Sequence, residues 1–365
     1  MQIFFTVLSV SLISSTLAFF IVIAEKYLNN YGECKIDINN GERVLKVEGG
    51  SSLLSSLASQ KIFIPSACGG KATCGLCKIQ VIDGAGPLLP TEEPYLTKDE
   101  IKNNVRLSCQ IKIKKDLKIK VPEELFNIKQ FKARIEKIEQ LTHDIKGIRF
   151  ALIEPDEIRF KAGQYVQLYT KPYGKVKESV FRAYSMASPP SDNHAVELII
   201  RKVPQGICTT YVHSHLSEGD EVTLSGPYGD FFLRDGASDL VFIAGGSGLA
   251  PIRSLVLDIL QKGLEKNMSF FFGAVSAKDL YYIDFFRELE ERHSNFKFIP
   301  ALSKPEPSDN WSGETGLITE VVDRYILDAQ NKEAYLCGSP GMINACLNVL
   351  KKKGFADNAI FFDKF

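Results

Sequence analysis

At 365 residues the chain is longer than one hydrophobic core usually supports, so two or three domains are expected. Lys and Arg total 44, as do Asp and Glu, and this balance argues against a nucleic-acid partner. Eight cysteines are too few for disulfide bonds to be the main source of stability in a chain this long, which argues against a small secreted protein held together by disulfides.

Residues 1–26 are predicted to be a transmembrane anchor. No side chain from Ile3 to Ala24 is charged, and a helix of this length spans a bilayer. A cleaved signal peptide is the alternative, although the run has neither a charged n-region nor a small-x-small cleavage site. Lys26 and Lys35 follow the run, so the positive-inside tendency predicts a single-pass protein of the inner (cytoplasmic) membrane with its other domains on the cytoplasmic side.

Residues 33–123 are predicted to form a small α+β domain. Alternating strands, turn residues and one helical pattern support this. The expected elements are a hairpin of Cys34–Ile38 and Arg43–Val47, a helix over 51–59, a strand over 78–82 and paired strand-like runs between 107 and 121.

Four cysteines of this domain have the spacing of cluster ligands. Cys68, Cys74 and Cys77 share one glycine-rich loop, and Cys109 follows after 31 residues. A [2Fe-2S] cluster needs four thiolates, two per iron. Zinc is an alternative, although structural zinc sites usually pair their ligands in two close sets; four unrelated buried thiols are another. The remaining isolated cysteines are expected to be small buried hydrophobic residues: Cys34, Cys208 and Cys346.

Residues 129–232 are predicted to form an antiparallel β-barrel, because short strands alternate with turn residues. Arg182, Tyr184 and Ser185 lie on one of these strands. An arginine neutralises a phosphate, a tyrosine offers a ring face to an isoalloxazine, and a serine can hydrogen-bond the flavin N5 edge. An ordinary strand of mixed polarity is the alternative.

A second phosphate cradle is predicted just before a helix in the same domain. Gly206 allows close backbone approach, while Thr209, Thr210 and the helix N–H groups supply hydrogen-bond donors. Two phosphate-binding points favour FAD over FMN.

Residues 236–365 alternate strands and helices, which is typical of a parallel, Rossmann-like α/β domain. A glycine turn follows the strand Leu240–Ala244 and opens a helix, so backbone donors and the helix dipole would face a pyrophosphate. The predicted binding residues of this turn are Gly245, Gly246, Ser247, Gly248 and Pro251. Cys337 ends a later strand, at the sheet edge where such folds bind ligands, and is expected to border a nicotinamide. A small residue in a tight turn is the alternative there.

These constellations, in this order, resemble the ferredoxin-reductase superfamily with an N-terminal [2Fe-2S] ferredoxin module, and within it the family of F subunits of sodium-translocating NADH:quinone oxidoreductases. The likeness extends over nearly the whole chain and includes Leu89–Glu92, Arg106–Gln110, Arg182–Ala187, Asp309–Gly313 and Phe362–Phe365. It implies a ferredoxin-like (β-grasp) domain, an R-x-Y-S flavin motif, and a C-G-x-P turn near the nicotinamide that includes Gly338 and Pro340. By its position Phe365 would cover the flavin ring. The family carries a long insertion between Val166 and Arg182, where this chain has a short connection.

The predicted function is electron transfer from NADH through FAD to the cluster, and on to other subunits of a membrane quinone-reductase complex. A nicotinamide gives two electrons as hydride and the cluster takes one, so the flavin stands between them; Ser185 and Cys337 are the predicted catalytic residues. NADH is preferred to NADPH because Ser276–Asp279 holds no Arg for a 2′-phosphate. The alternatives are the reductase of an oxygenase or another soluble acceptor, and a zinc-bearing redox sensor that binds a dinucleotide.

Overall fold

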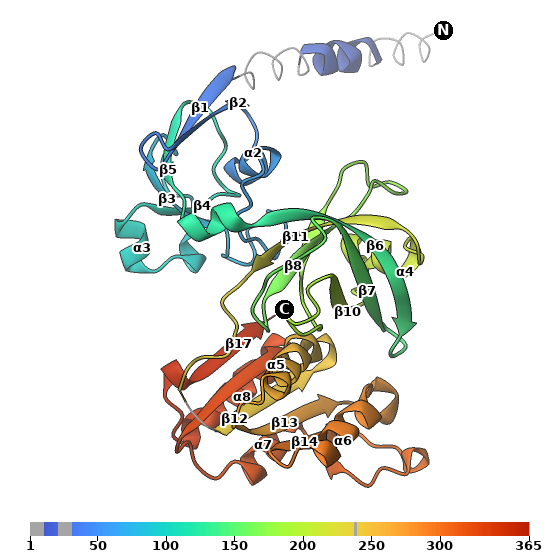
Figure 1. Ribbon diagram of the computed structural model, residues 1–365. Helices are drawn as coiled ribbons and strands as arrows, with labels where there is room; N and C mark the ends of the chain where they lie inside the picture. The colour runs from blue at the N-terminus through green and yellow to red at the C-terminus, as the bar shows by residue number, and fades with distance from the viewer. Residues whose placement is uncertain (1–10, 21–30, 237–238, 365) are drawn as a thin grey trace. The chain divides into compact units, whose positions relative to one another are not determined.

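The computed structural model describes residues 11–20, 31–236 and 239–364. These residues belong to two compact units, Met1–Ile128 and Lys129–Phe365 (Figure 1).

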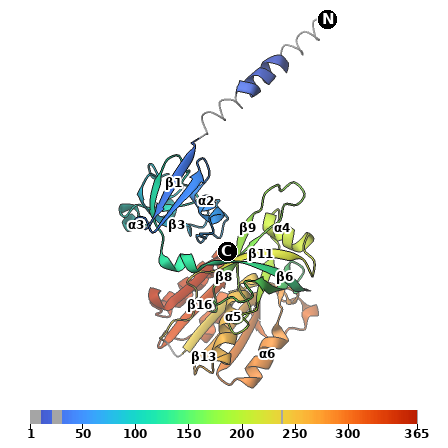
Figure 2. The ribbon, with the colours of Figure 1, turned by 45° about the horizontal axis from the view of Figure 1, so that its top comes forward.

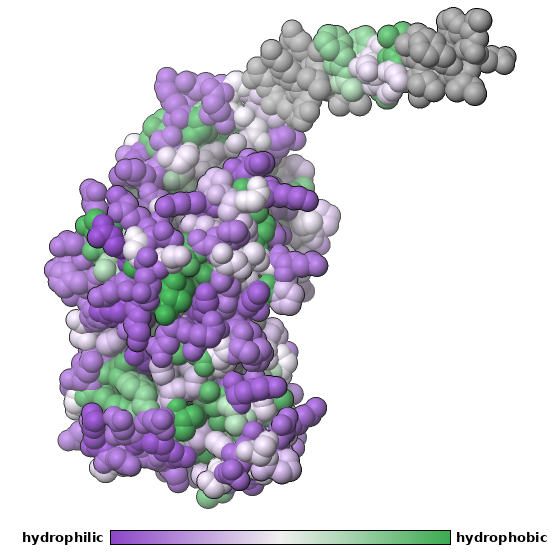
Figure 3. Space-filling model, turned by 90° about the vertical axis from the view of Figure 1, so that its right-hand side faces the viewer, coloured by the Kyte–Doolittle hydropathy of each residue, from purple (hydrophilic) through white to green (hydrophobic). Residues whose placement is uncertain are grey.

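The predicted anchor at residues 1–26 falls largely outside the described residues. Residues 11–20 form a helix, and its large apolar side chains are 61 to 70% exposed (Figure 3): Leu12, Ile13, Leu17, Phe19 and Phe20. Within the described ranges, no helix combines the length and the apolar character that crossing a membrane requires. The anchor therefore stays a prediction.

The first unit is an α+β domain built on a mixed sheet of order β2-β1-β5-β3-β4, in which only β1 and β5 pair in parallel. Its elements are β1 (Glu33–Ile38), β2 (Arg43–Glu48), α2 (Leu53–Ser59), β3 (Lys78–Asp83), α3 (Lys98–Lys102), β4 (Val105–Leu107) and β5 (Leu117–Lys120). Apolar side chains of α2 and the sheet form one buried core. The predicted hairpin and helix are confirmed, and the Ser52 side chain caps α2.

The expected pairing between the runs at 107–121 is wrong. β4 and β5 do not pair with each other; both pair with β3, which lies between them. With three and four residues, β4 and β5 are too short to form a stable hairpin of their own, whereas the six-residue β3 offers each of them an edge.

The second unit begins with a nearly closed antiparallel barrel of order β10-β7-β6-β11-β8-β9. Its elements are β6 (Lys129–Gln140), β7 (Ile145–Glu154), β8 (Tyr165–Tyr169), β9 (Phe181–Ser185), β10 (Ala195–Arg201), α4 (Ile207–Ser214) and β11 (Glu221–Tyr228). A bridge between Met186 and Leu198 links the two end strands of the order. Side chains of α4 belong to the barrel core. The predicted antiparallel barrel is confirmed.

The unit continues with a parallel sheet of order β15-β14-β13-β12-β16-β17 (Figure 2). Its strands are β12 (Asp239–Gly245), β13 (Asn267–Ala274), β14 (Phe296–Leu302), β15 (Glu314–Thr315), β16 (Lys332–Gly338) and β17 (Ile360–Lys364). Its helices are α5 (Leu249–Gln261), α6 (Ile283–Arg292), α7 (Ile318–Tyr325) and α8 (Pro340–Lys352). Two separate cores, one with α5 and α6 and one with α7 and α8, cover the two faces, as predicted for a Rossmann-like domain.

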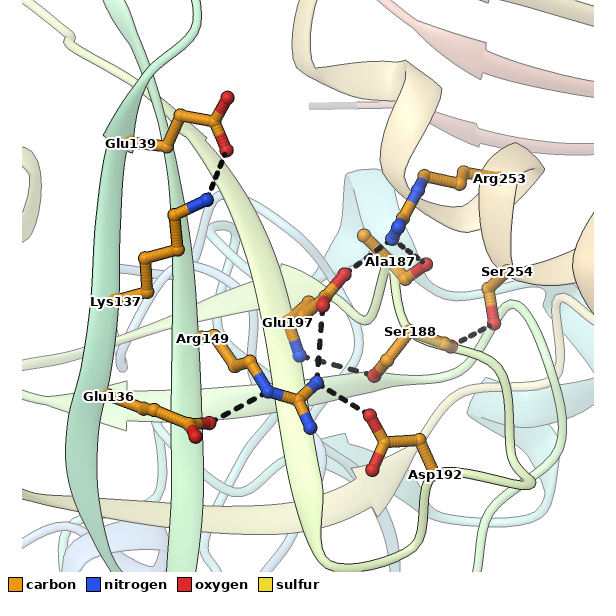
Figure 4. A network of polar contacts seen from close by, with 10 residues as sticks. All are labelled: Glu136, Lys137, Glu139, Arg149, Ala187, Ser188, Asp192, Glu197, Arg253 and Ser254. Carbon is orange, nitrogen blue, oxygen red and sulfur yellow. Dashed lines mark hydrogen bonds and ion pairs between the residues drawn. The ribbon is translucent and has the colours of Figure 1, made fainter. Parts of the chain in front are cut away.

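A polar network joins the barrel to this parallel domain (Figure 4). Glu197 on β10 accepts hydrogen bonds from Arg149 on β7 and from Arg253 on α5. The Ser254 hydroxyl donates to the Ser188 carbonyl at 2.7 Å. Ser254 is fully buried, and apolar residues of both parts share one core. The network therefore fixes α5, and the glycine turn that precedes it, to the barrel.

Candidate functional site

The four predicted cluster cysteines of the first unit lie outside its strands and are grouped in two pairs. The Cys74 thiol donates to the Cys68 sulfur at 3.4 Å, and the Cys77 thiol is hydrogen-bonded to Cys109. These hydrogen bonds lower the pKa of the accepting thiols, Cys68 and Cys109. Among the described residues, no three His, Cys, Asp or Glu side chains are grouped so as to hold a single metal ion. Two thiol pairs form the donor set that a two-iron cluster requires, and they fit that group.

The backbone of the loop turns its amides toward these sulfurs. Backbone N–H groups of Lys71 and Thr73 donate to Cys68, and that of Ala72 donates to Cys109. The loop reaches this shape through left-handed conformations at Gly69, Gly70, Ala72 and Gly75. Such amide hydrogen bonds stabilise negative charge on sulfur.

A buried ion pair holds the chain just before Cys109, and sequence analysis did not identify it. Glu92 is fully buried and accepts hydrogen bonds from the Arg106 guanidinium and from Leu107 N, the latter at 2.9 Å. Arg106 also donates to the Gly86 carbonyl at 2.9 Å. The pair therefore ties the loop that contains Gly86 to the strand that leads to Cys109. The two residues belong to motifs that carry the family likeness, but nothing in the spacing indicated that they meet.

The predicted flavin motif lies on β9, which pairs with β8. Arg182 and Tyr184 share one face of the strand by its two-residue period, and Ser185 is its last residue. Burial raises the pKa of the Tyr184 phenol well above its usual value. The Arg182 guanidinium donates only to the adjacent Phe181 carbonyl among the bonds found in the described residues. Its charge is thus not neutralised by a carboxylate there, as a phosphate-binding arginine requires.

The predicted phosphate cradle is the N-terminal end of α4. Gly206 is its N-cap, and the Thr209 hydroxyl exchanges hydrogen bonds with Val203 N and O at 3.1 and 3.2 Å. Thr209 is buried and thus serves the turn itself. Thr210, half-buried in the same helical turn, is the hydroxyl better placed to reach a ligand.

The glycine turn predicted to bind a nucleotide, residues 245–248, packs directly on the end of β16. A Cβ atom at Gly248 would lie 2.8 Å from Gly338 N and closer still to the Cys337 carbonyl, so this position admits no side chain. Cys337 itself is fully buried, and burial raises the pKa of its thiol well above the usual value. Ser339 caps α8, and Pro340 follows at the first helical position. The N-terminal ends of α5 and α8 thus meet at one edge of the sheet, which suits a pyrophosphate.

The remaining residues of the turn occupy the expected positions. Gly245 ends β12, Gly246 and Ser247 form a 3-10 turn with Gly248, and Pro251 lies in the first turn of α5. The predicted flavin cover, Phe365, lies outside the described residues.

Arg201 is a candidate that sequence analysis missed. A Cβ atom built on Gly246 would lie 3.2 Å from its guanidinium Nη1, so this cation stands beside the glycine turn. Asp144 holds it through a 2.6 Å ion pair to Nε. The only available signal was a basic residue at the end of the apolar strand β10.

On the prediction that this turn binds NADH, replacing Gly248 by alanine is expected to raise the KM for NADH about 5- to 150-fold, because the turn must shift against rigid backbone and such overpacking costs about 1–3 kcal/mol. Steady-state NADH oxidation with ferricyanide measures this. Gly341→Ala is the matched control, since no atom lies within 4 Å of a Cβ there, and its KM should stay near the wild-type value. Equal KM values for the two variants would contradict the tight packing of the turn.

Comparison with known proteins supplies the family context. Residues 36–114 match the model of the 2Fe-2S iron-sulfur cluster binding domain, residues 132–233 the oxidoreductase FAD-binding domain, and residues 242–348 the oxidoreductase NAD-binding domain. The F subunit of a Na(+)-translocating NADH-quinone reductase from Pasteurella multocida is 36% identical, with 96% of both chains aligned. An Amycolatopsis cytochrome P450 reductase has a similar structure, with a TM-score of 0.72 and 27% identity over 91% of this chain and 98% of its own. A ferredoxin reductase in carbazole 1,9a-dioxygenase gives a TM-score of 0.69 and 26% identity over 92% and 98%.

Proposed function

Because the chain belongs to the family of F subunits of Na(+)-translocating NADH-quinone reductases, we propose that it oxidises NADH and passes the electrons through FAD to a [2Fe-2S] cluster. The three matched domain models confirm the predicted cofactors. The observation that carries the proposal is the grouping of the four cysteines in two thiol pairs, since single-electron output depends on them.

In this proposal Cys68 and Cys74 hold one iron, and Cys77 and Cys109 hold the other. The grouping follows the thiol pairs and gives two thiolates per iron. Bound FAD would supply the conversion between a hydride and single electrons that no side chain provides.

The flavin would be held by the barrel. Arg182 neutralises a phosphate, the Tyr184 ring packs on the isoalloxazine, and the Ser185 hydroxyl donates to its N5 edge. Gly206 and Thr210 contact the second phosphate through the N-terminal end of α4.

The parallel domain would bind the dinucleotide. The backbone amides from Gly246 to Gly248 receive the pyrophosphate, and Arg201 adds a positive charge beside them. The nicotinamide would be bordered by Cys337, Gly338 and Pro340. Because α5 is fixed to the barrel, the nicotinamide would stay close to the isoalloxazine ring.

The electron acceptor would be the other subunits of a membrane quinone-reductase complex, reached from the cytoplasmic side of the inner membrane. Residues 1–26 would anchor the chain there as a single span, supported by the uncharged run from Ile3 to Ala24.

An anaerobic visible spectrum of the purified full-length chain, before and after NADH, tests the proposal. Flavin and iron-sulfur absorption are expected to bleach together, and NADPH should act more slowly. A colourless protein after iron-sulfur reconstitution and addition of FAD would overturn it.

A second candidate acceptor is an oxygenase component, favoured by the structural likeness to the P450 and dioxygenase reductases. An experiment with membranes that lack this chain distinguishes the two candidate electron acceptors. Recovery of NADH-dependent quinone reduction on adding the full-length protein supports the membrane complex. No recovery, together with rapid reduction of a soluble oxygenase, would support the second candidate.

A further inference from the structure

Ser108 is a buried serine that lies next to Cys109 in the chain and is bonded through its backbone to Cys77. Ser108 is fully buried, and its Oγ makes no complete hydrogen bond with any group of the described residues. Buried polar groups almost always find a partner, so an unpartnered hydroxyl calls for an explanation. Its position beside the thiol pairs supplies one.

Backbone hydrogen bonds fix Ser108 against Cys77 and against α2. Ser108 N donates to the Cys77 carbonyl at 2.8 Å, and Leu54 N of α2 donates to the Ser108 carbonyl at 3.1 Å. Cys109 is the next residue in the chain. The backbone of Ser108 is therefore held between Cys77 and α2, which fixes this buried residue beside one thiol pair.

The Ser108 hydroxyl is a hydrogen-bonding neighbour of the Cys77 sulfur. A serine O–H rotates to suit its acceptor. A deprotonated sulfur is the stronger acceptor, so the bond would shorten once Cys77 is a ligand.

We propose that the Ser108 hydroxyl donates a hydrogen bond to the Cys77 sulfur of the cluster-loaded protein and thereby raises the reduction potential of the cluster. The inference rests on the proposed function, in which Cys77 is an iron ligand. One-electron reduction adds negative charge to the iron-sulfur unit, and a donor to its sulfur stabilises the reduced form more than the oxidised form. Backbone amides also donate to these sulfurs, and the side chains of Thr73 and Gln110 donate to Cys68 and Cys109. Ser108 is the side-chain donor found at Cys77 among the described residues, and substitution can remove it.

The test is a redox titration of the full-length protein with dithionite, followed by the EPR signal of the reduced cluster. Ser108→Ala is expected to lower the equilibrium constant for cluster reduction about tenfold, which is about 59 mV for a one-electron couple. Ser108→Thr keeps the hydroxyl and should restore a potential near that of the wild type. Ser56→Ala removes a buried hydroxyl from α2 of the same unit and should leave the potential unchanged.

An unchanged potential in Ser108→Ala, with wild-type contents of iron and acid-labile sulfide, would overturn the inference while leaving the proposed function standing. If Ser108→Ala fails to assemble, Ser108→Gly takes its place in the titration. A lower potential in Ser108→Gly supports the bond, and a potential equal to that of the wild type contradicts it. A wild-type protein without iron or sulfide would instead refute the proposed function, and the inference with it.

Discussion

Replacing Cys77 by alanine is expected to abolish the iron-sulfur cluster and to leave reduction of the flavin by NADH intact. Loss of a ligand removes a charged donor of the inner shell, so the effect should exceed the roughly 10–100-fold loss of metal affinity that follows from changes in the surrounding shell. In the proposed function the flavin is held by residues of the second unit and the cluster by cysteines of the first, so loss of the cluster leaves the flavin site intact. Transfer to a one-electron acceptor beyond the cluster should fall by the same large factor.

Cys34→Ala is the matched control for that experiment. Cys34 is a buried cysteine of the same unit, 2% exposed on β1, and it lies outside the two thiol pairs. Iron and acid-labile sulfide should stay at wild-type levels in this variant and vanish in Cys77→Ala. Stopped-flow absorbance separates flavin bleaching from cluster bleaching in both. If Cys77→Ala retains two irons, or if Cys34→Ala loses them, the assignment of ligands is wrong.

Local chemistry made the cysteine loop predictable from the sequence. Three thiols within ten residues, with glycines between them, leave few folded arrangements, and Gly69, Gly70 and Gly75 do adopt the positive φ that such a loop needs. The parallel sheet was equally predictable from the sequence, because the apolar strand pattern of β12 is followed directly by a glycine turn and the start of a helix.

Contacts between distant segments were not predictable in the same way. Glu92 and Arg106 each look like ordinary surface charges, and their burial depends on how the loop around Gly86 folds back on β4. Arg201 reaches the glycine turn because β10 of the barrel ends beside Gly246. Pairing of β4 and β5 through β3 is also a property of the assembled sheet, since neither short strand specifies its partner.

Arg106→Met is expected to destabilise the first unit by about 3–5 kcal/mol, because it leaves the Glu92 carboxylate buried without its partner. Glu92 is fully buried, and the Arg106 side chain is 8% exposed. The double variant Glu92→Gln with Arg106→Met should recover a large part of that loss, since both charges are then gone. Urea unfolding of the full-length protein, followed by loss of cluster absorbance, measures the change.

Lys78→Met is the control, because it breaks an ion pair that is partly exposed to solvent instead of buried. The Lys78–Glu100 pair has 35 and 28% exposed side chains and a 2.7 Å contact, and breaking such a pair costs about 1 kcal/mol or less. Because Leu107 N also donates to Glu92, disruption of the buried pair should release the strand that leads to Cys109, and iron should be lost at lower urea than in Lys78→Met. Equal unfolding midpoints for the two variants would mean that the buried pair contributes no more than a surface pair.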